Sequence, residues 1–177
     1  MTFQMNWILK AGNILDEPAD VLIYSANPHL TLSGGVGADF LARYGGAMHN
    51  YLQQEMRKRS PHFALCGEII PYTGAGLPYK AVLHAVAIDG WYDSSPAVIT
   101  EVVNRALKMA AGYGARNVAL TALAIGFGHL TLAQFGEGLV PLWDREFAPI
   151  EDVRICLLED YRVRDLAQAM PFATVVA

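Results

Sequence analysis

Two glycine-rich turns carry the residue types best suited to chemistry in this chain. The first spans residues 33–38 (S-G-G-V-G-A) and follows the apolar run 21–24, and the second spans residues 124–129 (A-I-G-F-G-H) and follows the run 117–123. Glycines at strand ends let the backbone approach a ligand closely and point successive N–H groups at one place. If a helix follows, its N-terminus favours anions. Two such turns predict a ligand with more than one phosphate, which indicates a nucleotide-like molecule.

The elements that position these turns follow an alternating pattern. Apolar runs alternate with longer helical patterns, which is typical of a layered α/β fold. Strands are predicted over residues 7–10, 21–25, 68–72, 81–88, 118–122 and 153–158, and helices over 37–59, 96–113, 131–143 and 161–170. The strands are continuously apolar, as expected of central strands covered on both faces. No linker, repeat or low-complexity segment interrupts the pattern, so we expect a single domain over residues 1–177.

Two helix signals and the apolar tail refine this prediction. The helix over residues 37–59 carries one apolar stripe, with side chains such as Phe40, Met48 and Leu52 at spacings of three and four residues. Ser95 before Pro96 is a capping residue followed by a proline suited to a first helical turn. The apolar tail over residues 171–177 is expected to pack on the sheet edge or on a neighbouring molecule.

Composition excludes several classes of protein. The chain has 177 residues, of which 53% are hydrophobic and 17% charged, so it can bury a sizeable core. The net charge is −4 with scattered basic residues, which excludes a footprint for duplex nucleic acid. No apolar run reaches the roughly 20 residues of a membrane span, and the N-terminus lacks the basic start of a secretory signal. We therefore expect a soluble, cytoplasmic protein with no membrane partner, and no pattern indicates an oligomeric state.

The cysteines and histidines give no metal or redox signature. Cys66 and Cys156 lie far apart without C-x-x-C spacing, so a disulfide framework or zinc site is not expected. Both lie in strand-like apolar runs, where free cysteine behaves as a small hydrophobic residue. His84 lies in a buried strand pattern and is interpreted as a hydrogen-bonded core histidine. We expect no metal and no cofactor.

Six segments, taken in order, carry a resemblance to a known family. They are Gly12-Asn13-Ile14, residues 19–27 (A-D-V-L-I-Y-S-A-N), the turn 34–36, residues 67–70, residues 76–86 and the turn 126–128. Single glycine motifs recur by chance, whereas this order over residues 9–170 is specific. The series resembles the macro domain family, modules that bind ADP-ribose or process derivatives such as Appr-1″-p. The resemblance implies a three-layer α/β/α fold with a mixed, mostly parallel central sheet and a crevice at the carboxyl ends of its central strands.

The resemblance implies an adenine subsite at Asn13, Ile14 and Tyr161. In the family an aspartate at the position of Asn13 accepts a hydrogen bond from the exocyclic amine of adenine. The amide oxygen of Asn13 can still accept, but without the charge that strengthens the bond. Tyr161 matches an aromatic residue that often stacks on adenine. From residue type alone, Asn13 is equally a turn asparagine and Tyr161 an outward ring at a helix start.

The resemblance also implies contacts to the phosphates and the distal ribose. Asn27 matches an asparagine that reaches the distal ribose, where its amide can serve paired hydroxyls. The first phosphate loop is matched by Gly34, Gly35, Val36 and Gly37, and the second by Ile125, Gly126, Phe127 and Gly128, with His129 adjoining. Val36 and Phe127 provide apolar walls that exclude water. The alternatives are a turn at Asn27, a core plug at Phe127 and a surface role for His129.

Three positions depart from the hydrolytic members of the family. Tyr24 stands where their first asparagine would be, Gly37 where their water-orienting aspartate would be, and Ile125 replaces a small hydroxyl residue. Hydrolysis at the distal ribose needs a positioned water and a group that orients or deprotonates it. These departures favour a binding module over an enzyme, and no catalytic residue is assigned.

We therefore expect the chain to bind ADP-ribose or an ADP-ribosylated molecule. Two alternatives stay open. One is a hydrolase of ADP-ribose derivatives: a mono-ADP-ribosyl hydrolase, an ADP-ribose-1″-phosphatase or a deacylase of O-acetyl-ADP-ribose. The other is an interaction module whose nucleotide cleft is degenerate, with Tyr24, Ile125 or Phe127 filling the groove.

Overall fold

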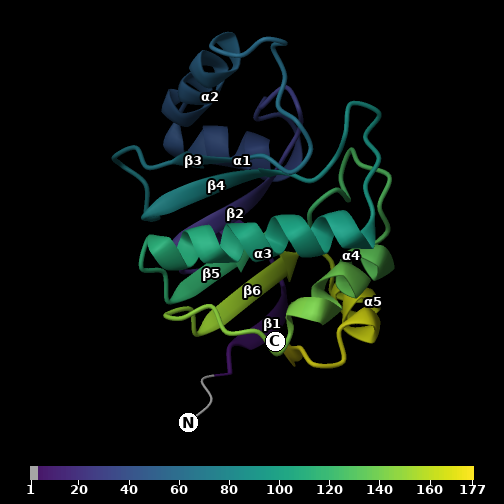
Figure 1. The fold of residues 1–177 in the computed structure, drawn as a ribbon. Helices are drawn as coiled ribbons and strands as arrows, with labels where there is room; N and C mark the ends of the chain where they lie inside the picture. Colours follow the sequence, from purple (N-terminus) through teal and green to yellow (C-terminus); the bar gives the residue numbers. More distant parts are fainter. Residues whose placement is uncertain (1–3) are drawn as a thin grey trace.

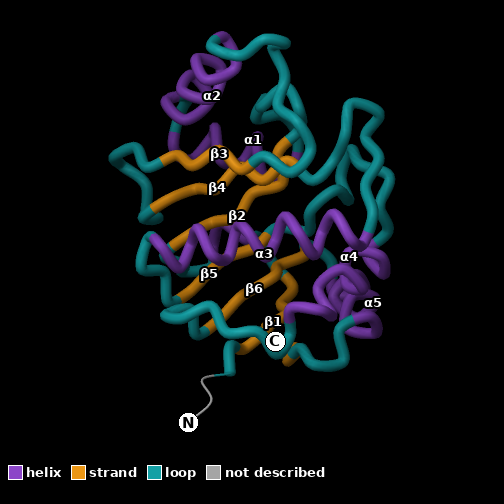
Figure 2. The backbone as a smooth tube through the Cα atoms, viewed as in Figure 1, coloured by secondary structure: helices purple, strands orange, loops and turns teal. Residues whose placement is uncertain are grey.

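A computed structural model describes residues 4–177, and within these residues seven strands form one sheet in the order β3-β4-β2-β5-β6-β1-β7 (Figures 1 and 2). The strands are β1 Asn6–Ala11, β2 Val21–Ala26, β3 Ile69–Tyr72, β4 Ala81–Val86, β5 Asn117–Leu120, β6 Asp152–Leu157 and β7 Thr174–Val176. The helices are α1 Gly35–Tyr44, α2 Ala47–Arg57, α3 Pro96–Gly112, α4 Leu132–Leu139 and α5 Asp160–Ala169, with short 3-10 helices η1 Ile14–Asp16 and η2 Val140–Leu142. Each predicted strand is present, with bounds shifted by at most two residues.

The sheet is mixed and mostly parallel, as predicted. Every neighbouring pair of strands is parallel except β3 and β4, which pair antiparallel at one edge. Because β2 and β5 are adjacent and parallel, and β6 and β1 likewise, their carboxyl ends share one edge of the sheet. The segments that follow these four strands are thereby brought together.

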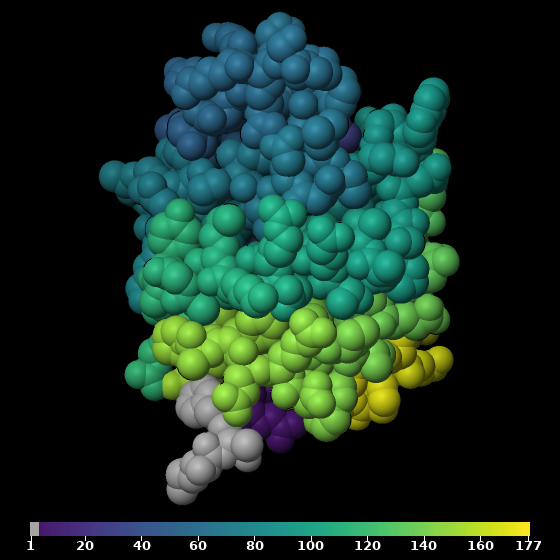
Figure 3. Space-filling view, viewed as in Figure 1, coloured from purple at the N-terminus to yellow at the C-terminus, as the bar shows by residue number. Residues whose placement is uncertain are grey.

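Helices cover both faces of the sheet, which confirms the three-layer fold. In β2, Val21 and Ile23 pack in a cluster with α3, α4 and α5, whereas Leu22 and Tyr24 pack in a second cluster with α1 and α2. A strand buried on both faces has no polar side to alternate, which explains its continuous apolar run. Figure 1 shows α3 lying across one face, and Figure 3 shows side chains closing that face.

The prediction of one helix over residues 37–59 is wrong, because α1 and α2 are separated at Gly45 and Gly46. Gly45 has φ of +77°, in the region that favours glycine, and its N–H donates to the carbonyl of Leu41 at 2.9 Å. Phe40 of α1 and Met48 of α2 nevertheless pack in the same cluster. The apolar stripe is therefore shared by two helices. By contrast, α3 begins as predicted, with Ser95 as its N-cap and Pro96 in its first turn.

The apolar tail packs on the edge of its own sheet. It includes β7, a strand absent from the prediction, which pairs parallel with β1. Just before β7, the ring of Phe172 lies 6.2 Å from that of Trp7 and 6.0 Å from that of Trp143, between ring centroids. Phe172 thereby fastens the tail to β1 and to the segment after η2.

The two cysteines are free and differ in their surroundings. Cys156 is buried in β6, as expected. Cys66 is exposed in the turn before β3, so the interpretation of Cys66 as a buried strand residue is wrong. The apolar run that suggested a strand there is a loop, and β3 starts only at Ile69.

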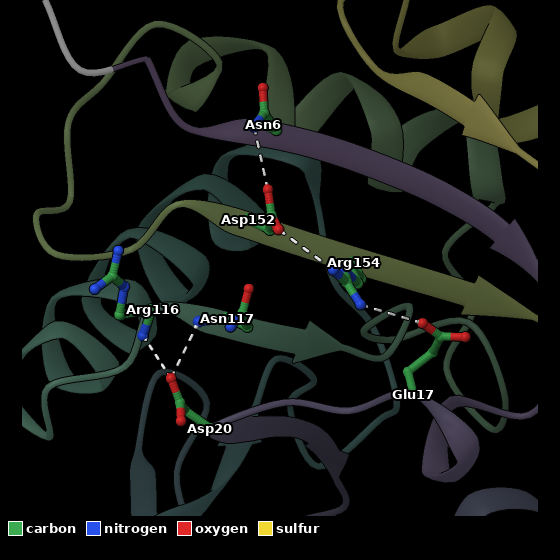
Figure 4. A network of polar contacts seen from close by, with 7 residues as sticks. All are labelled: Asn6, Glu17, Asp20, Arg116, Asn117, Asp152 and Arg154. Carbon is green, nitrogen blue, oxygen red and sulfur yellow. Dashed lines mark hydrogen bonds and ion pairs between the residues drawn. The ribbon is translucent and has the colours of Figure 1, made fainter.

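A polar network joins the amino ends of the central strands (Figure 4). The carboxylate of Asp20 accepts hydrogen bonds from the amides of Arg116 at 2.7 Å and Asn117 at 3.3 Å, which ties β2 to β5. Burial raises the pKa of Asp20, but these two bonds and the nearby Lys80 cation together hold the pKa below its ordinary value. Asn6 donates to Asp152 at 3.1 Å, tying β1 to β6. These contacts fix the strands at the edge opposite the glycine-rich turns.

Among residues 4–177, no helix combines the length and apolar character needed to cross a membrane.

Candidate functional site

A cavity of about 690 Å³ opens at the carboxyl ends of the central strands. Its walls come from the segments that follow β1, β2, β5 and β6, including Gly12–Ile14, residues 33–36, residues 124–128 and Leu158. The cavity is open rather than filled by Tyr24, Ile125 or Phe127, which argues against a degenerate cleft. Every residue that the sequence predicts for the site lines it, except Gly37, His129 and Tyr161.

The cavity forms where β2 and β5 separate at their carboxyl ends. The strand pairing ends at Ile23 and Leu120. Beyond this pair, hydrogen bonds that involve side chains connect the two segments. The amide of Ser25 donates to the hydroxyl of Thr121 at 2.8 Å, and the hydroxyl of Ser25 accepts from the amide of Ala124 at 3.2 Å. These bonds hold the strands while their chains diverge to either side of the crevice.

The first glycine-rich turn presents the open N-terminus of α1. The N-cap of α1 is Gly34, with φ of +64° and no side chain to cap the helix. The amides of Gly35 and Val36 donate to no other group within residues 4–177, and both residues line the cavity. Unpaired amides at a helix N-terminus, together with the helix dipole, form a site for an anion.

The second glycine-rich turn presents a further run of unpaired amides. In the described part of the chain, no acceptor lies within hydrogen-bond reach of the amides of residues 125–128. The turn is closed by a bond from the Leu130 amide to the Ala124 carbonyl at 3.2 Å. A Cβ at Gly128 would lie 2.2 Å from that carbonyl oxygen, so only glycine fits there. The close approach keeps the loop narrow and its amides free.

Phe127 bridges the two turns. Its side chain is 67% exposed, so the interpretation of Phe127 as a core plug is wrong. A Cβ placed on Gly34 would lie 3.3 Å from the ring, which shows that the ring rests against the first turn. Phe127 therefore forms an apolar wall that spans from one loop to the other.

Tyr24 and Gly37 fill the floor beneath the first turn. Gly37 is buried and does not line the cavity, and a Cβ there would lie 2.7 Å from the Tyr24 hydroxyl and 3.2 Å from the backbone of Leu32. The Tyr24 ring packs edge-on against His84, with 5.5 Å between ring centroids. Burial raises the pKa of Tyr24, so its phenol stays protonated. The tyrosine hydroxyl occupies the space that a side chain at position 37 would need.

Asn27 borders the cavity, but its amide closes a loop of the chain. Its Nδ2 donates to the Thr31 carbonyl at 2.9 Å, and its Oδ1 accepts from the His29 amide at 3.0 Å. This is the hydrogen bonding of a turn asparagine, the alternative drawn from residue type.

His129 and Tyr161 lie outside the cavity lining. The Nδ1 atom of His129 is 2.8 Å from the Asp93 carboxylate, and its amide donates to the Tyr92 carbonyl at 3.0 Å. These contacts fasten the second turn to the loop over residues 89–93, which lies beside it in Figure 1. Tyr161 is exposed on α5, and the next residue, Arg162, lines the cavity instead.

Asn13 and Asp39 meet at the end of the cavity that follows β1. The Oδ1 atom of Asn13 accepts from the Leu15 amide at 3.0 Å, capping η1, and its Nδ2 donates to Oδ2 of Asp39 at 3.0 Å. Asp39 lines the cavity, and sequence reasoning did not assign it to this site. A signal was present, because Asp39 lies four residues after Gly35 and therefore on the same face of α1.

His84 is buried at the centre of the fold. Its Nε2 lies 3.3 Å from the sulfur of Met48, while its Nδ1 has no partner within residues 4–177. Burial lowers the pKa of His84 to about 3, so the ring is neutral. The prediction of a buried core histidine is confirmed, but only one of its ring nitrogens has a partner within residues 4–177. In the described part of the chain, no three ligand-type side chains gather to hold a metal.

The family model described as Macro domain matches residues 23–135. An uncharacterized protein of Mycobacterium tuberculosis is 32% identical over 113 residues, which are 64% of this chain and 30% of that protein. A macro domain-containing protein of Streptomyces griseus is 28% identical over 120 residues, 67% of each chain. The chain thus spans less than a third of the mycobacterial relative.

Solved structures share the fold at low sequence identity. The Oceanobacillus iheyensis macrodomain with ADP has a TM-score of 0.75 at 17% identity, covering 90% of this chain and 86% of that one. The Trypanosoma brucei macrodomain in complex with ADP-ribose has a TM-score of 0.73 at 18% identity, covering 91% of this chain and 68% of that one.

Proposed function

Because the chain belongs to the macro domain family, we propose that it binds ADP-ribose or a related ADP-ribosyl nucleotide through its two glycine-rich turns. The observation that carries the proposal is the convergence of free amides from Gly35, Val36 and residues 125–128 on one cavity. Such amides and the N-terminus of α1 suit the two charges of a pyrophosphate. The similar macrodomains of O. iheyensis and T. brucei were solved with ADP and ADP-ribose.

The shape and lining of the cavity support a nucleotide. Its volume of about 690 Å³ is typical of sites for small molecules. At the end that follows β1 and β6, the walls are Ile14, Leu157 and Leu158, whose apolar side chains suit the faces of a base. The free amides of the two turns line the same cavity. We therefore place the base at the Asn13 end and the pyrophosphate between the turns.

We propose a binding module rather than a hydrolase. Gly37 offers no side chain to orient a water, and the Tyr24 hydroxyl occupies the adjoining space. Ile125 adds only an apolar side chain to the second turn. General acid–base catalysis needs a polar group beside the reacting atom, and these three positions supply none but a protonated phenol. The ligand is the free nucleotide or an ADP-ribosylated molecule, and residues 1–177 are proposed to form the binding unit as one domain.

Isothermal titration calorimetry with ADP-ribose tests the proposal, and Gly126 offers a matched set of variants. A Cβ at Gly126 meets no protein atom within 4 Å, so Gly126→Ala should leave the fold unchanged and serves as the control for added side-chain volume in the turn. Gly126→Glu places a carboxylate in the second turn, and repulsion of about 1–3 kcal/mol should weaken ADP-ribose binding about 5- to 150-fold. Gly112→Glu adds the same charge to α3, also in open space, and should bind like the unchanged protein.

Two results would contradict the proposal. Absence of saturable heat with ADP-ribose at millimolar concentration would exclude the ligand class. Equal weakening by Gly126→Glu and Gly112→Glu would show that net charge acts rather than the second turn. Turnover of a mono-ADP-ribosylated protein, ADP-ribose-1″-phosphate or O-acetyl-ADP-ribose by the purified chain would overturn the assignment as a binding module.

A further inference from the structure

We propose that Trp91, on the loop over residues 89–93, contacts the polypeptide to which an ADP-ribosyl ligand is attached. The partner is then an ADP-ribosylated protein with a basic side chain beside its modified residue, rather than the free nucleotide. The inference rests on the proposed function, because it assumes that the cavity holds the ADP-ribosyl group. The place of the loop in the fold, its hydrogen bonding and its charge support this role.

The loop lies at the end of the cavity opposite the base. In the sheet order, β4 lies on the far side of β2 from β5, β6 and β1. Ile88, which follows β4, lines the cavity and leads directly into the loop. With the base after β1 and the diphosphate on the turns after β2 and β5, the next position along this edge is the one after β4. A group attached to the far ribose of the ligand therefore leaves the cavity toward residues 89–93.

Hydrogen bonds hold the loop in place. The Asp89 carboxylate accepts from the amides of Trp91 at 2.8 Å and Asp93 at 3.0 Å. Tyr92 has φ of +65°, in a region uncommon for residues other than glycine, and its carbonyl accepts from the His129 amide at 3.0 Å. The loop is thus fastened to the second turn, beside which it lies in Figure 1. Contact with a partner requires little further ordering of such a loop.

This loop keeps a large apolar side chain in water. Trp91 is 80% exposed, more than any other large hydrophobic side chain among residues 4–177. Single exposed apolar residues are ordinary on a protein surface, but Trp91 is held on a fixed backbone beside the exposed Phe127 turn. Tryptophan gives a large contact area at low entropic cost and is enriched at the centres of interfaces. A chain that leaves the cavity on this side can cover it.

The charges around Trp91 select the kind of partner. Residues 81–104 include Asp89, Asp93 and Glu101 but no lysine or arginine. Asp93 contacts His129, whereas the Asp89 carboxylate is bonded only to amides and pairs with no cation within residues 4–177. A lysine or arginine of the partner can lie over the indole face and near this carboxylate. The phosphates of a nucleic acid would instead be repelled.

Calorimetry with three ligands tests this on the intact chain. They are ADP-ribose, a peptide with one ADP-ribosyl serine flanked by lysines, and the same peptide with glutamates in place of the lysines. The lysine peptide should bind about 10-fold more tightly than ADP-ribose, as expected for a tryptophan at an interface. The glutamate peptide should lose this gain, and the lysine peptide without ADP-ribose should not bind measurably.

Variants assign the gain to Trp91. Trp91→Ala should remove it and leave the affinity for ADP-ribose unchanged, since Trp91 does not line the cavity. Val175→Ala removes an exposed apolar side chain of β7, at the far edge of the sheet, and should keep the gain.

Fluorescence gives a readout that loss of stability would not produce. Quenching of Trp91 by acrylamide should fall when the lysine peptide binds and stay high when ADP-ribose binds alone. Trp91→Phe removes this signal and leaves those of Trp7 and Trp143, so the difference between the two proteins reports Trp91.

The outcomes separate this inference from the proposed function. If the lysine peptide and ADP-ribose bind with equal affinity, the role of Trp91 is wrong while nucleotide binding stands. Equal weakening of both ligands by Trp91→Ala would also overturn it, because Trp91 would then act on the cavity itself. An ADP-ribosylated oligonucleotide that binds more tightly than the lysine peptide would identify a nucleic-acid partner instead. If neither ADP-ribose nor either ADP-ribosyl peptide binds at millimolar concentration, the proposed function and this inference fall together.

Discussion

At the residue scale, Tyr24 and Gly37 behave as one packed pair. The tyrosine hydroxyl stands 2.7 Å from the position of a Cβ on Gly37, closer than real Cβ contacts allow. Neither residue can therefore be exchanged without regard to the other. A larger residue at position 37 needs a smaller one at position 24.

Coupling between these two residues can be measured. Gly37→Ala should lower the free energy of unfolding by about 1–3 kcal/mol, because the added methyl group overpacks the floor. Tyr24→Phe removes the hydroxyl that crowds position 37 and keeps the ring that packs against His84, so it should cost little. In the Tyr24→Phe background, Gly37→Ala should cost less than it does alone, as expected for residues in contact. Urea denaturation of the four proteins gives the coupling energy, and strictly additive losses would contradict the packing.

Both glycine-rich turns were correctly predicted to line one cavity, but the side chains of His129 and Tyr161 were wrongly placed in it. Glycines mark the turns because close backbone approaches require them, as at Gly128 beside the Ala124 carbonyl. Asp39 and Arg162 were missed because the orientation of each helix relative to the cavity is set by tertiary packing, which the local sequence does not contain. The predicted start of the last helix is one residue later than the observed Asp160, and Arg162 rather than Tyr161 turns toward the cavity.

At the scale of elements, the apolar periodicity over residues 37–59 predicted which side chains are buried, but it did not predict that two helices carry them. The apolar spacing runs unbroken across Gly45 and Gly46 because α1 and α2 bury their side chains in the same cluster. Glycine within a helical pattern is tolerated, so the pair did not by itself indicate a break. Strand β7 was missed because it has three residues, all exposed, and only pairing with β1 defines it. Register and pairing are tertiary properties that a local pattern does not contain.

The attachment of β7 gives a prediction at this scale. Phe172→Ala removes the ring that contacts Trp7 and Trp143 and should lower the free energy of unfolding by about 1–3 kcal/mol. Thermal unfolding by circular dichroism measures the loss, and amide hydrogen exchange should show faster opening at residues 174–176. Phe63→Ala removes an exposed phenylalanine from the loop before β3 and should cost less. Equal losses for the two variants would contradict the anchoring role.

At the scale of the whole molecule, the covered sheet traps an ionisable group at its centre. His84 lies in β4 between strands β3 and β2, fully buried, with one ring nitrogen lacking a partner within residues 4–177. Burial disfavours the charged ring and lowers its pKa from 6.5 to about 3. Folding and protonation of His84 therefore oppose one another.

Stability should consequently fall as the solution becomes acidic. Below pH 6.5 the unfolded chain binds a proton at His84, whereas the folded chain binds it only near pH 3, so acid favours unfolding. The free energy of unfolding should drop by up to about 1.4 kcal/mol per pH unit in this range. Asp20 and Glu68 also stabilise the fold less in acid, but their pKa values are lowered from 3.8 and 4.5, so their effect begins only below about pH 4.5. Between pH 6.5 and 4.5 the loss of stability is therefore assigned to His84.

Urea denaturation across this pH range tests the claim. His84→Gln cannot titrate, so the variant should show a flatter dependence than the unchanged chain between pH 6.5 and 4.5, whatever its absolute stability. Parallel curves for the two proteins would show that another group causes the acid sensitivity.

The loop over residues 89–93, which the His129 amide joins to the second turn, carries one of the chain's three tryptophans. The three differ in their exposure to solvent. Trp91 on this loop is 80% exposed, whereas Trp7 is 3% exposed and Trp143, which is 40% exposed, shares the contact with Phe172. Intrinsic fluorescence from Trp91 should therefore emit at longer wavelength and be open to quenchers in solution, while Trp7 emits from an apolar site. One chain thus carries an optical probe beside its cavity and another at the far edge of its sheet.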